Sequence, residues 1–273
     1  MSPIFEDTKQ MYKYHRAPIF NELSHCLAGM IKFHKSWIWS WFGFLFVIAG
    51  TFLLASCAPI YMPTSPNTPM LTEKGDVKLE LNSSTSGLEI KGSFALTDNY
   101  VVTGLISAGS GDADDDTVDN SIHRYMEAGF GHSYRPAHYL VIETIAGSGL
   151  GYGKGEGRIT IGESTSTFMA EGTYIKPFLQ NNIALQTDAI DFGFVNRLSV
   201  IQFGSIKRVW GDEEMNNSPS TPLFWEPTLF FQFGWDRIKL AIQYGYSMPI
   251  AGEPEFEWMP LHFGFGINYR FGN

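Results

Sequence analysis

Large apolar residues alternate with small or polar residues along most of the chain after residue 76. In 260–271 one face carries Leu, Phe, Ile and Tyr, while the other carries His, Gly, Asn and Arg. A period of two is that of a β-strand with one apolar face. The pattern predicts strands over 76–83, 87–97, 100–108, 123–133, 138–149, 168–186, 189–206, 223–234, 237–248 and 260–271.

The links between these strands alternate in length. Short links fall at 97–99, 134–137, 187–188 and 235–237, and long links at 109–122, 150–167, 207–222 and 249–259. The link at 83–86 is the exception, because it is short but falls at the end of the strands where the other links are long. Short periplasmic turns and longer external loops are typical of outer-membrane barrels.

Strand length separates a membrane barrel from a soluble β-domain. Soluble strands average about five or six residues, whereas a membrane-crossing strand needs about 9–11. Most predicted strands here are of the longer kind. We therefore predict an all-β, antiparallel up-and-down transmembrane β-barrel of about ten strands. Because the fourth and fifth strands alternate less cleanly, eight or twelve strands are alternatives, and a tethered soluble β-domain is the competing fold.

The N-terminal region reads as a lipoprotein signal. Residues 36–54 are apolar and uncharged, with Lys32 and Lys35 before them, and they end in Leu54-Ala55-Ser56-Cys57. A basic flank followed by an apolar run and small residues is typical of a secretory signal. Leu-Ala-Ser-Cys resembles the bacterial lipobox, which predicts acylation of Cys57. An uncleaved anchor helix is the alternative.

The chain divides into four parts on this interpretation. Residues 1–29 precede a plausible start at Met30 and are interpreted as a mis-called start, and 30–56 are the signal peptide. Residues 57–75 contain four prolines and are predicted to be an extended tether, and 76–273 form the barrel. Since no Asp follows Cys57 directly, we expect an anchor in the outer membrane. Since no acidic run of the kind that resembles a surface-export signal follows it either, we expect that anchor in the periplasmic leaflet.

Three stretches carry a resemblance to a known family. CAPIYMP, TPMLTEKGDVKLEL and the terminal GINYRFGN resemble a family of lipoprotein-type outer-membrane barrels common in Bacteroidetes. The resemblance implies the location and the fold. It implies no settled activity, so no functional residues are carried over. The chain departs from the usual barrel-insertion signal in that Gly272 and Asn273 follow the last aromatic residue.

The alternation also predicts which charges face the lumen. Six cations and six anions have inward parity, and in a low-dielectric interior each must find a partner. We predict a packed network of ion pairs, with a proton or solute path as the alternative. Its members are Lys78, Lys91, Lys176, Arg197, Lys239, Arg270, Glu80, Glu89, Glu127, Glu143, Asp191 and Glu226.

Other candidate chemistry is weak. Asp112, Asp114 and Asp116 alternate as calcium ligands can, but Thr117 and His123 stand where Gly and Glu are needed. Gly131-His132-Ser133 is the only adjacent Ser–His pair, with His132 outward, and His123 and His138 are interpreted as rim residues. Gly147–Gly157 has phosphate-loop spacing without its Ser or Thr, and is predicted to be a flexible loop.

Interfacial aromatic residues are predicted at Trp225, Trp235, Trp258, Tyr244, Tyr246 and Tyr269.

Composition narrows the functional classes. Charged residues make up only 17% of the chain, aromatic residues 15%, and the net charge is -9. Because phosphate binding needs clustered Lys and Arg, nucleic acid is not expected as a partner. We predict a monomeric, non-enzymatic barrel with no cofactor or metal, in contact with outer-membrane lipids and with a structural or interaction role toward other envelope proteins. A lipid- or lipopolysaccharide-modifying enzyme and a narrow channel are the alternatives.

Overall fold

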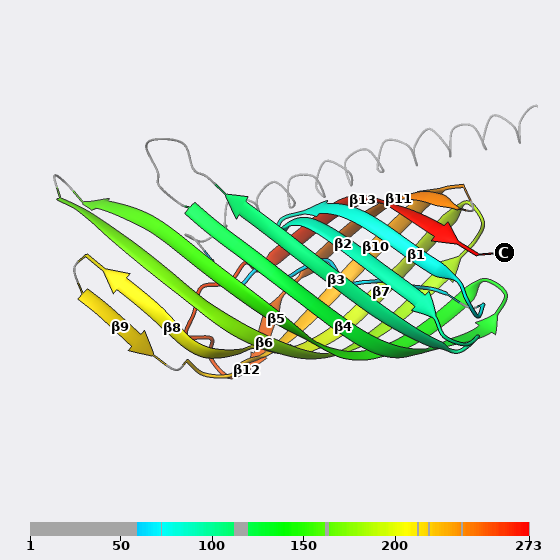
Figure 1. Ribbon diagram of the computed structural model, residues 1–273, viewed down its shortest axis with the longest axis horizontal. Coiled ribbons are helices and arrows are strands. Elements are labelled where there is room, and N and C mark those ends of the chain that lie inside the picture. The colour runs from blue at the N-terminus through cyan, green and yellow to red at the C-terminus, as the bar shows by residue number, and fades with distance from the viewer. Residues whose placement is uncertain are drawn as a thin grey trace, which may run out of the picture. The chain divides into compact units, whose positions relative to one another are not determined.

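The computed structural model describes residues 59–71, 73–111, 120–161, 164–211, 213–217, 219–235 and 237–272. Its strands belong to one sheet (Figure 1). No helix within these residues is long and apolar enough to cross a membrane. The strands are β1 Val77–Ser84, β2 Gly87–Ala95, β3 Tyr100–Gly111, β4 Asn120–Ala137, β5 Leu140–Ile161, β6 Ser164–Gln186, β7 Ile190–Val200, β8 Gln202–Trp210, β9 Glu213–Asn217, β10 Leu223–Gly234, β11 Ile238–Tyr246, β12 Met248–Ala251 and β13 Leu261–Phe271.

Ten of these strands close into an antiparallel barrel, as predicted. Strands β1 to β7 pair in chain order, β7 pairs with β10, β10 with β11, and β11 with β13. The pairing of β13 with β1 completes the ring. Closure leaves no unpaired edge within the barrel, which a lipid environment requires.

The period of two places the large apolar side chains outside. On β13, Phe263, Phe265 and Ile267 are exposed, whereas His262 and Asn268 are buried. The same division holds along β1, β2, β7 and β10. A continuous outer belt of Leu, Ile and Phe would not be stable against water, so the fold is that of a transmembrane barrel rather than of a tethered soluble domain.

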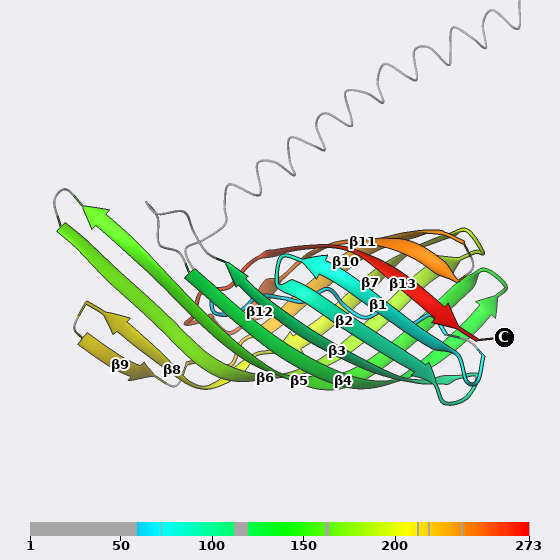
Figure 2. The same ribbon diagram turned by 45° about the horizontal axis from the view of Figure 1, so that its top comes forward.

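A projecting sheet, which we call the blade, replaces two of the predicted long loops. It is formed by the distal halves of β5 and β6 together with β8 and β9, and it extends past the other strands (Figure 2). The prediction of loops over 150–167 and 207–222 was therefore wrong. Strand β8 continues the line of β7 after an interruption at Ile201 and stays paired with β6.

Glycine explains why Gly147–Gly157 is not the flexible loop that we predicted. This stretch lies in β5, and its odd-numbered glycines face inward. A Cβ on Gly149 would lie 2.2 Å from Tyr125 Oη, and one on Gly151 would lie 2.1 Å from Tyr174 Cζ. The glycines therefore leave space for aromatic rings inside the barrel, a packing role that alternation of large side chains cannot reveal.

The outward face of β5 marks where contact with lipid ends. Leu150 is 58% exposed, as befits a lipid-facing residue. Two and four positions further, Tyr152 donates a hydrogen bond to Glu171, and Lys154 pairs with Glu156. Because charged side chains are costly on a lipid-facing surface, the apolar band ends between Leu150 and Lys154. The blade lies beyond that band.

Two of the predicted interfacial aromatic residues are exposed near strand ends. Trp235 is 81% exposed beside a short turn, and Tyr246 is exposed at the opposite end of its strand. The prediction was wrong for Trp258, which packs against Phe224 at the long-link mouth and donates to the Ser247 carbonyl. Its indole therefore helps to fill the barrel mouth.

Candidate functional site

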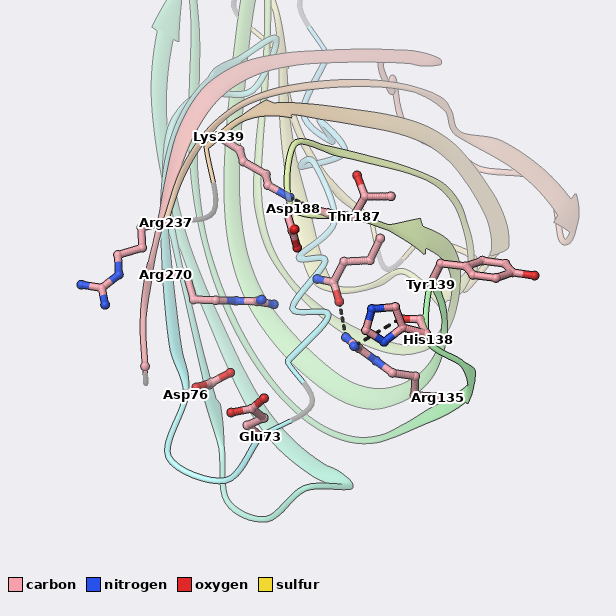
Figure 3. A pocket seen from close by; sticks show the side chains of 12 residues that line it. Glu73, Asp76, Arg135, His138, Tyr139, Thr187, Asp188, Arg237, Lys239 and Arg270 are labelled. Atoms are coloured by element: carbon pink, nitrogen blue, oxygen red, sulfur yellow. Dashed lines mark hydrogen bonds between the residues drawn. The ribbon is translucent and has the colours of Figure 1, made fainter.

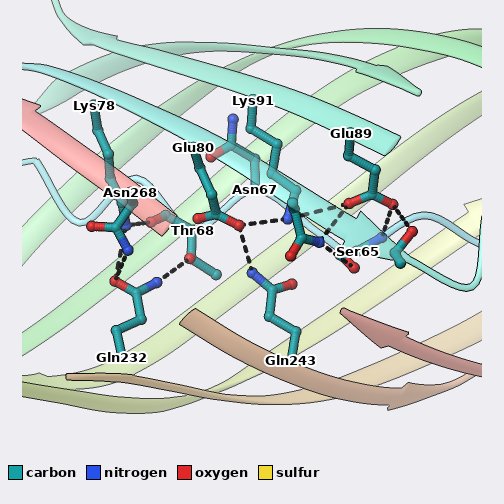
Figure 4. A network of polar contacts seen from close by, with 12 residues as sticks. Ser65, Asn67, Thr68, Lys78, Glu80, Glu89, Lys91, Gln232, Gln243 and Asn268 are labelled. Carbon is teal, nitrogen blue, oxygen red and sulfur yellow. Dashed lines mark hydrogen bonds and ion pairs between the residues drawn. The ribbon is translucent and has the colours of Figure 1, made fainter. Parts of the chain in front are cut away.

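The lumen contains the segment that we predicted to be a tether outside the barrel. All of residues 59–71, which we call the plug, are buried. They run through the barrel in an extended conformation, and Ser65, Asn67 and Thr68 are hydrogen-bonded to the inner faces of β1 and β2 (Figure 4). The plug is the main departure from the sequence prediction, and it makes the lumen the candidate functional site.

The N-terminal end of the plug is held at the mouth with the long links. The amides of Ile60 and Tyr61 donate to the Glu257 carbonyl, and the Met259 amide donates to the Tyr61 carbonyl. The Tyr61 hydroxyl donates to Glu226, and its ring packs edge-on against Tyr174 at 5.5 Å. This end is therefore part of the aromatic core of the mouth.

Polar side chains hold the middle of the plug. The Ser65 amide donates to Glu89 Oε1 at 3.0 Å. Asn67 accepts from Ser93 Oγ at 3.1 Å, and its backbone carbonyl accepts from Gln180 Nε2 at 2.7 Å. Buried polar groups are stable only when they are hydrogen-bonded. The wall thus supplies the partners that water would supply to a free tether.

The C-terminal end of the plug is fixed at Met70. Its amide donates to Glu143 Oε1 at 2.8 Å, and its carbonyl accepts from Gln186 and from Arg270. The φ angle of Met70 is 51°, in the left-handed region that non-glycine residues rarely adopt. Such a conformation persists only where its surroundings hold it, which here are three side chains of the wall.

The prolines suit a chain confined in this way. Proline lacks an amide proton and favours an extended backbone. A plug rich in proline therefore brings fewer donors into the lumen than other extended chains of the same length would. The four prolines of the plug are Pro59, Pro63, Pro66 and Pro69.

The predicted ion network is present for most of its members. Arg197 binds Glu127 through two hydrogen bonds of 3.0 Å, with both side chains almost fully buried. The other pairs are Lys91 with Glu80 at 2.8 Å and with Glu89 at 3.5 Å, Lys176 with Glu226 at 3.0 Å, and Lys239 with Asp191 at 2.8 Å.

Three predicted members contact the plug instead of an opposite charge. Lys78 Nζ donates to the Thr68 carbonyl at 2.7 Å and to Gln232. Glu143 accepts from the Met70 amide and from Asn182, and Arg270 donates to the Met70 carbonyl. For these side chains the prediction of partners from the wall alone was incomplete, because part of their coordination comes from plug backbone.

A cavity of about 310 Å³ opens at the mouth with the short turns (Figure 3). Arg135 and Arg270 reach into it, and Arg135 donates to Gln186 and to the His138 carbonyl. Arg237 points away from it. Gln186 and Arg270, which bind the Met70 carbonyl, line this cavity, so it is a vestibule next to the C-terminal end of the plug. Its lining contains both acidic and basic side chains.

The predicted histidine and serine candidates do not form a catalytic site in the described residues. His123 is not a rim residue: it is 2% exposed, and its Nε2 lies 3.0 Å from the Tyr174 hydroxyl. His132 points outward, as predicted, and Ser133 is buried on the opposite face, so the two cannot act as a nucleophile and base. His138 is exposed at the vestibule.

Two predicted sites lie outside the described residues. These are Cys57 and the Asp112, Asp114 and Asp116 series. Within the residues that the structure covers, no three His, Cys, Asp or Glu side chains are grouped as a metal site would require.

Comparison with known proteins finds matches among solved structures alone. No family model and no curated protein matches the chain. Among solved structures, the translocator domain of the autotransporter NalP from Neisseria meningitidis matches at 9% identity and a TM-score of 0.43, over 72% of this chain and 87% of that one. CarO of Acinetobacter baumannii matches at 8% and 0.33, over 74% and 99%. OmpT, an outer membrane protein of Vibrio cholerae (loop L8 deletion mutant), matches at 9% and 0.25, over 72% and 97%.

Proposed function

We propose that this protein is a lipid-anchored, monomeric outer-membrane barrel whose lumen is closed and whose role is to bind other molecules at the cell surface. The observation that carries the proposal is the plug, because it occupies the lumen from one mouth to the other. A channel needs an open aqueous path, and here hydrogen-bonded backbone and ion pairs take up that space. The function then belongs to the parts outside the lumen.

Cys57 supplies the lipid anchor in this proposal. Acylation would replace the S–H bond of its thiol with a thioether bond to a diacylglyceryl group. The phosphate headgroup of the donor phospholipid would leave with the proton. The support is the Leu54–Cys57 motif after an apolar run.

The blade offers the binding surface. On its inner face, Phe168 stacks on Trp210 at 6.1 Å, and Trp210 and Met215 are 52% and 47% exposed. The neighbouring positions on β5 are glycines that leave this face flat. Exposed aromatic and methionine side chains are enriched where proteins bind partners. Envelope proteins or external ligands are therefore the expected partners.

Negative charges introduced on the apolar face of the blade should abolish partner capture. We expect Trp210→Glu/Met215→Glu to lose the species that wild-type protein captures from intact cells treated with a membrane-impermeant cross-linker. Trp235→Glu is the control, because Trp235 is also exposed but lies at the short-turn end. Purification and mass spectrometry compare the three. An unchanged set of cross-linked species in the blade variant would contradict the proposal.

A further inference from the structure

The contacts at the two ends of the plug fix the direction in which it runs. Met70 contacts Glu143 and Arg270, which lie near the short turns. Ile60 instead contacts Glu257 in the last long link. A Cβ on Gly153 would lie 1.7 Å from the Ile60 carbonyl oxygen, so the two backbones touch. The chain thus enters at the long-link mouth and descends to the short-turn mouth, where β1 begins.

The level of Ile60 can be related to the membrane. Gly153 lies between Leu150 and Lys154, the positions on β5 between which the outward face changes from apolar to charged. Ile60 therefore lies at the edge of the apolar band on the long-link side. In outer-membrane barrels the longer connections face the exterior of the cell. The N-terminal end of the plug is thus at the outer surface.

The length of chain between Cys57 and the plug is short. Cys57 precedes Pro59 by two residues, and consecutive Cα atoms are 3.8 Å apart, so their separation is at most about 8 Å. The apolar band of such barrels is about 25 Å tall. An acyl group on Cys57 cannot cross that band while Pro59 stays at the long-link mouth. The periplasmic leaflet that the sequence led us to expect is out of its reach.

We propose that the diacylglyceryl group of Cys57 inserts into the outer leaflet, so that the barrel carries its own lipid on the cell surface. This inference rests on the acylation of Cys57, which is part of the proposed function, and it specifies the membrane leaflet in which that lipid lies. The plug is then a tether that passes through the barrel. It links a surface lipid to a strand that begins on the periplasmic side.

The test is a site for a sequence-specific protease inserted between Ala58 and Pro59, in cells labelled with radioactive palmitate. Protease added to intact cells should remove the label from the barrel while the barrel stays in the membrane. The same site placed at Asp98-Asn99, in a short turn, should resist cleavage until the cells are permeabilised. Mobility in unheated gels verifies that each variant is folded.

Two results would overturn the proposal, and they are distinguishable. Cleavage after Ala58 only in permeabilised cells would place the lipid in the periplasmic leaflet and leave the acylation intact. Equal palmitate labelling of wild type and Cys57→Ser would show that Cys57 is not acylated. This second result would leave the evidence for the plug and for the blade unchanged.

Discussion

Arg197→Met should lower the free energy of unfolding by about 3–5 kcal/mol, the cost typical of breaking a buried ion pair by removing one partner. Arg197 is buried, holds Glu127 with two hydrogen bonds, and donates to Gln180 at 2.8 Å. In the variant, the hydroxyl of Tyr125 is the one side-chain donor that Glu127 retains within the part of the chain that the structure describes. A carboxylate left in this position would be desolvated and poorly compensated.

The double variant Arg197→Met/Glu127→Gln is the matched test of that reasoning. Because it removes both charges, it should recover much of the lost stability. Lys207→Met is the control, since its pair with Glu214 is at the surface, with side chains 39% and 53% exposed, and such pairs contribute about 0–1 kcal/mol. The urea concentration at which the compact band disappears from unheated gels measures the effect. A double variant less stable than the single one would contradict the account.

Phe265→Arg should impair membrane insertion strongly. Phe265 lies in the middle of β13 and is 48% exposed on the outer face. An arginine facing lipid near the midplane costs about 2–4 kcal/mol, falling to about 0–1 near either interface. The expected result is a lower folded fraction after dilution from urea into lipid vesicles, read from gel mobility without boiling.

Phe271→Arg provides a matched control for depth. Phe271 has the same residue type on the same strand, is also 48% exposed, and lies at the strand end. It should insert nearly as well as wild type. Equal loss at both positions would show that the defect comes from folding of β13 in general, and equal tolerance would show that Phe265 does not contact lipid.

The barrel could be predicted from the sequence because its determinants are local. The period of two, read along 260–271 or 237–248, gives the direction of every side chain once one face is known to be apolar. The same parity identified the charged residues that face the lumen, and the ion pair of Arg197 with Glu127 is an example. The alternating link lengths then oriented the strands.

The plug could not be predicted because its sequence is compatible with two environments. A chain with Pro59, Pro63, Pro66 and Pro69 is extended both in water and in a lumen. What distinguishes the two is the partner of each backbone group, and these partners, such as Glu143 and Gln180, are distant in sequence. Parity placed Lys78 and Arg270 in the lumen, but it could not show that they bind carbonyl groups of the plug.

The blade was missed because glycine carries no hydropathy signal. In GSGLGYGKGEG the inward positions are empty, so the alternation vanishes although the strand continues. The rings of Tyr125 and Tyr174 that occupy this space come from β4 and β6. A run of alternate glycines opposite aromatic residues on the neighbouring strands was the available sign of a strand.

The most direct test of the plugged lumen is the conductance of the folded protein in planar lipid bilayers. Mobility in unheated gels verifies beforehand that the reconstituted protein is folded. The account predicts that the folded wild-type protein is electrically silent, because the buried plug fills its lumen. A steady conductance through the folded wild-type barrel would contradict it.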